Sequence, residues 1–132
     1  EKGYQKIREY GLQDNIIFEG RTKDVAGVIK SCDVMCLASF FEGFSNSLSE
    51  YICCGKPVLC SDINENTIMV KDGINGFTFD PYNIESIAEA FIKFFNLDLD
   101  KKLQMGFKSR EIAEDLFNKE EFVEAYVKLI EN

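Results

Sequence analysis

The sequence contains no histidine among its 132 residues, and this absence removes several kinds of enzyme chemistry. Zinc hydrolase sites and Ser-His or Cys-His nucleophile schemes would have no imidazole to serve as ligand or base. Cations are also scarce, because 15 Lys and Arg stand against 23 Asp and Glu, which gives a formal charge of -8. This balance argues against a nucleic acid partner, since binding to a phosphate backbone requires a basic face.

Long apolar runs and paired cysteines are missing too. No stretch approaches the roughly 20 apolar residues that span a bilayer, so we expect a cytoplasmic protein. The five cysteines are odd in number and lack Cys-x-x-Cys spacing, which argues against a disulfide framework or a zinc site. We expect buried free thiols, because a free cysteine packs as a small apolar residue. These cysteines are Cys32, Cys36, Cys53, Cys54 and Cys60.

Residues 40 to 62 carry the clearest succession of local signals: a loop, a helix, a turn and a strand. Polar residues that can cap a helix precede the apolar pattern, and the helix should begin near Asn46. Gly55 suits the left-handed position that ends a helix, and Pro57 prevents its continuation. Residues 58 to 60 then resume as a buried strand.

Two carboxylates flank the start of this helix. Glu42 lies in the preceding loop, and Glu50 lies one turn inside, pointing away from the apolar face formed by Leu48, Tyr51 and Ile52. The free amides and positive dipole end of a helix favour a phosphate, which two carboxylates alone would repel. Carboxylates accept hydrogen bonds from sugar hydroxyls, so a ligand with two polyol ends and a diphosphate between them resolves the conflict. The pattern therefore predicts a nucleotide-sugar site.

Strand and helix signals alternate along the rest of the chain, which predicts an α/β domain with a parallel sheet and helical C-terminal cover. We expect strands at residues 15–19, 33–38, 58–60 and 77–79. We expect helices at residues 1–11, 24–31, 46–55, 64–70, 84–95, 99–117 and 119–130. No internal repeat or linker is evident, so residues 1 to 132 are treated as one domain.

Several motifs resemble those of retaining glycosyltransferases of family four, the glycosyl transferases group 1, which have the GT-B fold. Glu42 and Glu50 are separated by seven residues, as in the Glu-x7-Glu motif of that family. The resemblance covers about residues 10 to 95 in the order and spacing of the family. The matching segments are residues 18–21, 24–25, 31–39, 42–50, 54–58 and 72–77.

This resemblance implies a role for each matching residue. Glu42, the candidate catalytic residue, would contact hydroxyls of the donor sugar, and Glu50 would hold the two ribose hydroxyls. Backbone groups would make most of the other contacts. The donor sugar would be contacted by Phe44, Ser45 and Asn46, and the diphosphate by Ser47 and Leu48. The nucleobase would lie against Gly20 and Arg21. No metal or other cofactor is implied, since amides and cations can stabilise the departing charge.

The resemblance also implies a Rossmann-like, doubly wound sheet, the C-terminal half of a GT-B fold, that is incomplete at its N-terminus. We therefore expect residues 1 to 132 to be a partial C-terminal donor-binding domain, inactive alone. The complete enzyme would transfer a sugar, with retention, from a nucleotide-diphosphate sugar to a glycan or lipid-linked acceptor in polysaccharide biosynthesis. Acceptor binding and any contact with the inner face of the membrane would lie in a missing N-terminal domain.

The sequence departs from the family pattern at three places. Ala38 stands where proline is usual, Asn64-Glu65 replaces a glycine pair, and Ile68 falls where an acidic residue is usual. The glycine replacement bears on how closely that loop approaches a diphosphate.

Two other functions stay open. One is a non-catalytic nucleotide-sugar-binding or regulatory module, and the other is a different GT-B enzyme such as a sugar-nucleotide epimerase, which the lack of histidine disfavours. Without the surrounding motifs, Glu42 reads as a loop carboxylate, Glu50 as a solvated helix residue and Gly20-Arg21 as a plain turn. Lys56, just past the helix, reads as a solvated turn lysine.

Overall fold

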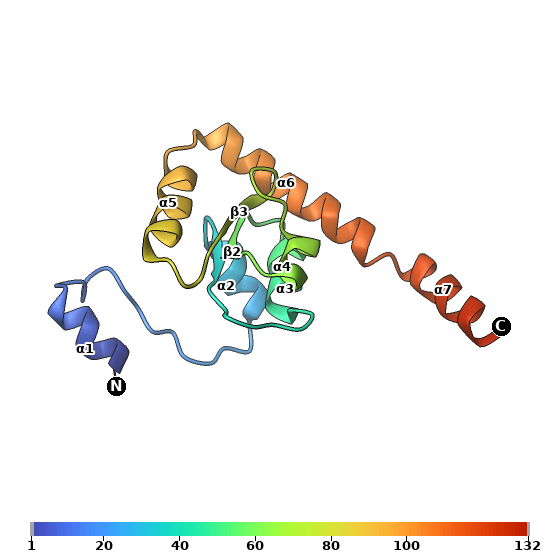
Figure 1. The fold of residues 1–132 in the computed structure, drawn as a ribbon, viewed down its shortest axis with the longest axis horizontal. Helices are drawn as coiled ribbons and strands as arrows, with labels where there is room; N and C mark the ends of the chain where they lie inside the picture. Colours follow the sequence, from blue (N-terminus) through green and yellow to red (C-terminus); the bar gives the residue numbers. More distant parts are fainter. Residues whose placement is uncertain (1, 132) are drawn as a thin grey trace.

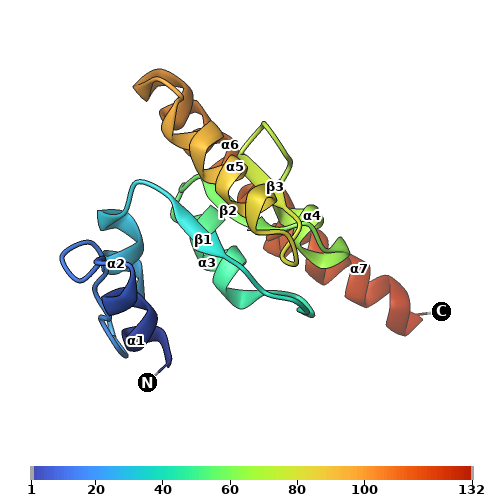
Figure 2. The same cartoon turned by 60° about the vertical axis from the view of Figure 1, so that its left-hand side comes forward.

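The computed structural model describes residues 2 to 131, and the side chains at residues 2–121, 123, 124, 127, 128 and 130. Three short strands, β1 (Met35–Leu37), β2 (Val58–Ser61) and β3 (Gly76–Phe79), form one sheet in the order β1-β2-β3. Both pairings are parallel, with Met35 opposite Val58 and Val58 opposite Gly76. Figure 2 shows the three strands side by side. The predicted α/β fold with a parallel sheet is confirmed.

Helices cover both faces of this sheet (Figure 1). The crossover helices α3 (Asn46–Cys53) and α4 (Asn64–Met69) cover one face, and α5 (Ile84–Phe95) packs against the other. The long helix α6 (Leu99–Leu116) contributes to the core on both sides, with Ala113 beside α3 and α4 and Met105 beside α5. The remaining helices are α1 (Lys2–Glu9), α2 (Val25–Ser31) and α7 (Lys119–Glu131). Helices on both faces of a parallel sheet are the Rossmann-like arrangement that the sequence predicts.

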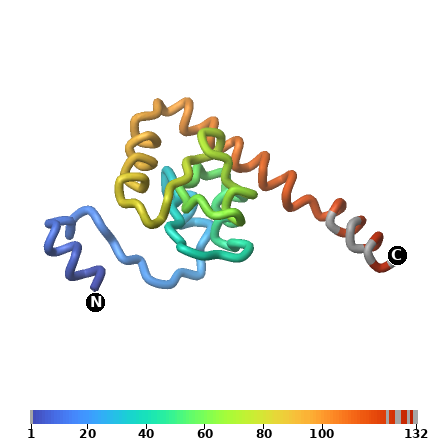
Figure 3. Tube along the Cα trace, viewed as in Figure 1, coloured from blue at the N-terminus to red at the C-terminus, as the bar shows by residue number. Residues whose placement is uncertain are grey.

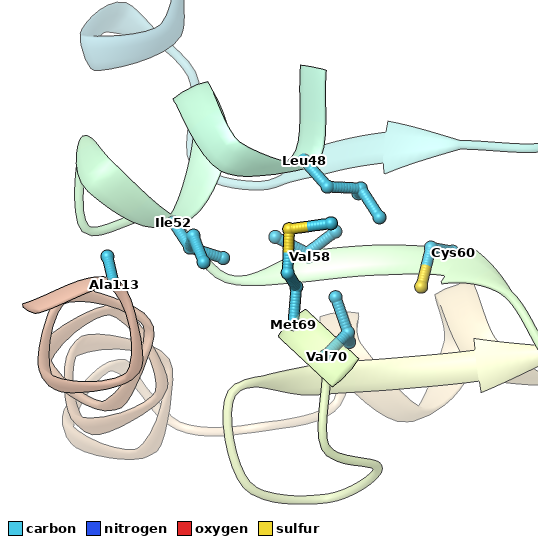
Figure 4. Packing of buried hydrophobic residues seen from close by; sticks show 7 residues of the cluster. All are labelled: Leu48, Ile52, Val58, Cys60, Met69, Val70 and Ala113. Carbon is cyan, nitrogen blue, oxygen red and sulfur yellow. The ribbon is translucent and has the colours of Figure 1, made fainter. Parts of the chain in front are cut away.

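The core consists of two apolar clusters that meet at β2, whose four residues are all buried. Figure 4 shows the cluster beneath α3, α4 and α6, formed by Leu48, Ile52, Val58, Cys60, Met69, Val70 and Ala113. The cluster on the opposite face contains Leu59, Phe79, Ala90, Phe94 and Met105. Alternate residues of β2 serve opposite clusters because successive side chains of a strand point to opposite faces. Two covered faces therefore explain the unbroken apolar run at residues 58 to 60.

The turn after α3 and the middle of α6 approach each other through two glycines. Gly55 adopts a left-handed conformation (φ +67°), as the sequence predicts for the residue that ends this helix. A Cβ added to Gly106 would lie 2.5 Å from the carbonyl oxygen of Gly55, so the close contact depends on the missing side chain. Ser109 Oγ also donates to the carbonyl oxygen of Lys56 at 2.7 Å. These contacts hold α6 against α3.

Asn75 and Gly76 fix the start of β3. Asn75 is fully buried, and its Nδ2 donates to the carbonyl oxygen of Met69 at 3.0 Å while its Oδ1 accepts from the amide of Lys71 at 2.7 Å. A Cβ on Gly76 would lie 1.7 Å from the carbonyl oxygen of Val58, which leaves no room for a side chain. Asn75 thus holds the turn before β3, and Gly76 allows β3 to lie close to β2.

The strand predicted at residues 15 to 19 is wrong. This segment lies between α1 and α2 as a turn at Asn15 followed by irregular, unpaired backbone, and Ile17 is 79% exposed. The phenyl ring of Phe18 packs on Tyr4 of α1, at 4.4 Å between ring centroids. Residue composition gives a tendency toward extended backbone, but a strand also needs a hydrogen-bonding neighbour, and none of the described residues provides one.

Lys56 is not a solvated lysine, which corrects the expectation from sequence. Its Nζ donates to the carbonyl oxygens of Lys30 (2.8 Å) and Cys32 (2.6 Å), at the end of α2. Since the last carbonyls of a helix lack partners within the helix, the ammonium caps α2. Sequence spacing could not reveal this contact, because it joins residues 24 and 26 positions apart.

The expectation of buried thiols is also wrong for most of the cysteines. All five are free, but Cys60 alone among them is buried, and Cys36 is exposed. Cys36 lies on β1, where its side chain points to one face of the sheet, and neither apolar cluster of the core includes it.

The C-terminal helices are close to their predicted limits. Figure 3 shows α7 continuing away from the body of the molecule after α6, so that the two ends of the chain lie far apart. Among the described helices, none is both long and apolar enough to cross a membrane.

Candidate functional site

The candidate site residues after β1 lie at the edge of the sheet where the strands end. In an open parallel sheet, ligands bind outside the carboxyl ends of the strands. The loop at residues 38 to 45 follows β1 and leads directly into α3, so strand and helix together position it. This edge therefore holds the predicted Glu42 and the start of α3.

A tight turn holds the carboxylate of Glu42. The hydroxyl of Ser39 donates to Glu42 Oε1 at 2.6 Å, and both residues are half-buried. A hydrogen bond to an ionised carboxylate is short and restricts its orientation. Glu42 is therefore a fixed acceptor rather than a freely moving loop residue. Ser39 lies in one of the matching motifs, but nothing in its sequence context indicates this role.

The first turn of α3 is capped by Ser45. Its buried Oγ accepts from the amide of Leu48 at 3.3 Å, and its carbonyl accepts from the Ser49 hydroxyl at 3.0 Å. Because the first amides of a helix have no acceptor inside it, those of Asn46 and Ser47 can face a ligand. A role for Leu48 in diphosphate binding stays a prediction, and it requires the cap bond to be shared or exchanged. Its side chain is part of the core.

Glu50 has the predicted orientation on α3. Leu48 and Ile52 are fully buried, whereas Asn46 and Glu50 are exposed. Tyr51 lies between these two sides, where burial raises the pKa of its hydroxyl and a hydrogen bond with Ser47 opposes that rise. The helix thus presents one carboxylate to solvent, close to its positively polarised N-terminus.

Phe44 joins the loop to the far end of α6. Its ring meets Phe117, the residue that follows α6, edge-on with 6.1 Å between centroids. The predicted role of its backbone amide leaves the ring free for this contact. The C-terminal helices therefore touch the segment that carries Glu42.

Gly20 and Arg21 are not brought to the other site residues. Gly20 has a positive φ of +72°, which fits a turn, but both residues are exposed in the unpaired segment before α2. Within the described part of the chain, no hydrogen bond or ring contact joins either residue to the loop at residues 38 to 50. Their assignment to the nucleobase stays a prediction.

Asn66 is a site-edge residue that sequence analysis missed. It is fully buried near the start of α4, and its Nδ2 donates to the carbonyl oxygen of Ser61 at the end of β2 (3.0 Å). Its Oδ1 has no hydrogen-bond partner in the described structure. Ile63, the residue before α4, provides no side-chain cap for this helix. Asn66 thus ties the start of α4 to the end of β2.

Two lysines in the connections between strands donate to backbone carbonyl oxygens. The ammonium of Lys56 caps α2, and that of Lys71 donates to the carbonyl oxygen of Thr67 at 2.6 Å. Over the residues that the structure describes, no three Cys, Asp or Glu side chains gather in a way that could hold a metal ion.

Comparison with known proteins identifies the family of the chain. A family model described as "Glycosyl transferases group 1" matches residues 1 to 112. The chain belongs to this family. Its parallel sheet with helices on both faces is the Rossmann-like arrangement of GT-B glycosyltransferases, and the chain fits their C-terminal domain.

Two curated members of the glycosyl transferases group 1 align with most of the chain. One is the UDP-Gal:alpha-D-GlcNAc-diphosphoundecaprenol alpha-1,3-galactosyltransferase of Escherichia coli, 28% identical over 68% of this chain and 23% of its own length. The other is the poly(glycerol-phosphate) alpha-glucosyltransferase of Bacillus subtilis, 32% identical over 70% of this chain and 14% of its own length. The chain thus spans less than a quarter of either relative.

A solved structure shares the fold of this group 1 domain. The Anabaena protein Alr3699/HepE, crystallised in complex with UDP-glucose, superimposes with a TM-score of 0.83 at 23% identity, over 96% of this chain and 36% of that one. The match covers residues on both sides of the candidate site.

Proposed function

We propose that this chain binds the nucleotide-diphosphate sugar donor of a retaining glycosyltransferase. The observation that carries the proposal is the arrangement at the start of α3: a carboxylate fixed by Ser39, a helix N-terminus and a second carboxylate at Glu50. The membership of the family and the printed ligand of the Anabaena neighbour support a nucleotide sugar as the donor.

Each part of the ligand has a chemically matched group. Glu42 accepts hydrogen bonds from hydroxyls of the transferred sugar, and Glu50 accepts those of the ribose. Between them, the amides at the start of α3 and its dipole favour the diphosphate. The fixed carboxylate of Glu42 loses little freedom on binding, which favours an oriented donor.

The reaction that follows from this reading occurs on one face of the sugar. The bond between C1 and the leaving diphosphate oxygen breaks, and the acceptor oxygen bonds to C1 on the same face, so configuration is retained. The acceptor proton passes to the leaving diphosphate. Backbone amides stabilise the departing charge without a metal, because they are oriented before reaction.

We propose only the chemical class of the acceptor. The Escherichia coli and Bacillus subtilis relatives are named for a diphosphoundecaprenol-linked sugar and a poly(glycerol-phosphate). A glycan or lipid-linked acceptor, bound mainly by another part of a longer enzyme at the inner face of the membrane, fits both. In this reading residues 1 to 132 form part of the C-terminal domain and are inactive alone.

Calorimetric titration of the intact protein tests the proposal. UDP, GDP and ADP, alone and as sugar conjugates, are titrated with a chelator present. We expect one nucleotide to bind, and Glu50→Gln to weaken it, while the exposed Glu89→Gln on α5 leaves affinity unchanged. If folded protein binds none of the three, the donor-site proposal fails. If the full-length protein binds a donor but transfers no sugar to a glycan or lipid-linked acceptor supplied with it, a regulatory binding module replaces the enzyme.

A further inference from the structure

Three aromatic side chains at the carboxyl edge of the sheet are largely exposed. Phe40, Phe41 and Tyr82, here called the aromatic platform, are 61%, 87% and 78% exposed. Large apolar residues that gather on a surface without cover mark a place of interaction. None of the roles proposed above uses these rings.

In the turn that carries two of these rings, the polar side chains are more buried than the apolar ones. Ser39 and Glu42, which are polar, are half-buried and bonded to each other, whereas the two phenylalanines between them point to solvent. Folding alone favours the opposite arrangement, because apolar side chains gain free energy when they leave water. The Ser39 hydrogen bond therefore closes the turn that carries both rings beside the Glu42 carboxylate.

Tyr82 supports the platform from another part of the chain. Its ring lies 5.0 Å from that of Phe40, with 42° between the ring planes. Tyr82 follows β3 and Phe40 follows β1, so the contact joins the loops after the two outer strands of the sheet. The backbone of Tyr82 is held by its amide, which donates to Asp80 Oδ1 at 2.9 Å.

The neighbouring charges limit what the platform can bind. Glu42 lies in the same turn and the exposed Asp80 lies beside Tyr82, so the surroundings are acidic. Carboxylates repel an anionic ligand but accept hydrogen bonds from hydroxyls. The face of an aromatic ring is negative and attracts polarised C–H groups. A neutral pyranose ring, with C–H groups on one face and hydroxyls at its rim, satisfies both.

We propose that Phe40, Phe41 and Tyr82 form a subsite for a pyranose ring of a carbohydrate acceptor, beside the donor site. The inference rests on the proposed function, because it is Glu42 that places the platform next to the transferred sugar. It adds the acceptor's chemistry: the sugar unit that contacts this chain carries no anionic group.

The test uses neutral glycosides and the intact protein. Methyl glycosides of glucose, galactose and N-acetylglucosamine, and their disaccharides, are the probes, with binding followed by saturation-transfer NMR in the presence of the nucleotide that binds best. We expect at least one glycoside to bind, and Phe41→Ala and Tyr82→Ala each to weaken it roughly tenfold. The matched control is Phe107→Ala on α6, whose ring is 70% exposed outside the platform.

Nucleotide affinity separates this inference from the proposed function. The platform variants should bind the nucleotide as the wild type does, since their rings have no role in donor binding. If nucleotide binds but no glycoside does, or if the variants retain glycoside binding, the subsite is wrong while the donor site stands. Equal weakening by Phe107→Ala would show non-specific contact and would also overturn the subsite. Loss of nucleotide binding by the wild type would overturn the proposed function itself.

Discussion

The Ser39 hydroxyl donates a hydrogen bond of 2.6 Å to Glu42 Oε1, and this bond closes a turn between residues three positions apart. We expect Ser39→Ala to lower the turnover number of the proposed transferase roughly ten- to hundredfold, because a charge-assisted hydrogen bond contributes about 1.5–3 kcal/mol. Nucleoside diphosphate affinity should not change. Ser39→Thr keeps the hydroxyl and should restore turnover; if it does not, the bond does not position Glu42.

Glu50 and Glu42 should respond differently to removal of charge. Glu50→Gln should weaken nucleoside diphosphate binding by roughly 1–3 kcal/mol, the range for a hydrogen bond to a charged group. Glu42→Gln should instead lower turnover and leave the affinity for free nucleotide unchanged. Calorimetry and initial rates measure the two effects. Wild-type behaviour of both variants would contradict the assignment of this site.

Gly106 should tolerate no side chain. In Gly106→Ala the new Cβ would lie 2.5 Å from the carbonyl oxygen of Gly55, so α6 must move away from α3. We expect a loss of about 1–3 kcal/mol in the free energy of unfolding, as for other overpacked contacts. Urea denaturation measures the loss. Gly43→Ala is the control, because a Cβ there meets nothing within 4 Å; an equal loss in both would contradict the packing argument.

Stability should fall in alkaline solution because of Cys60. Burial raises the pKa of this thiol from 9.0 to about 12. Its contribution is therefore complete below pH 9, where both states keep the proton, and is lost as pH rises from 9 toward 12, where the unfolded chain releases it first. The slope should approach about 1.4 kcal/mol per pH unit.

Urea denaturation at several pH values between 7 and 11, under reducing conditions, measures this effect. Cys60→Ala should be less stable at pH 7, since it leaves space in the core, but its stability should depend less on pH. Parallel curves for the two proteins would show that another group governs the alkaline loss.

Local signals predict the centre of the molecule well. The cap, the apolar face at Leu48 and Ile52, and the glycine after α3 all act within one or two turns, and the structure confirms each. The exposure of Glu50 follows from the same periodicity. Helical signals of this kind need no knowledge of distant residues.

What the sequence could not predict depends on distant partners. Residues 15 to 19 have the composition of a strand but no neighbour among the described residues, and Lys56 finds its acceptors at the end of α2. The contact of Phe40 with Tyr82 likewise joins two loops that sequence spacing keeps apart. Composition and periodicity carry no information about contacts between residues that are far apart in the sequence.

The free side of β1 has a practical consequence. In the described structure this strand pairs with β2 alone, so the peptide groups along its other side can accept a further extended segment. Adding such a segment leaves both apolar clusters intact and requires no unfolding. We therefore expect aggregation of the isolated domain to begin with native molecules, and to be suppressed by an edge-capping peptide more than by conditions that raise the melting temperature.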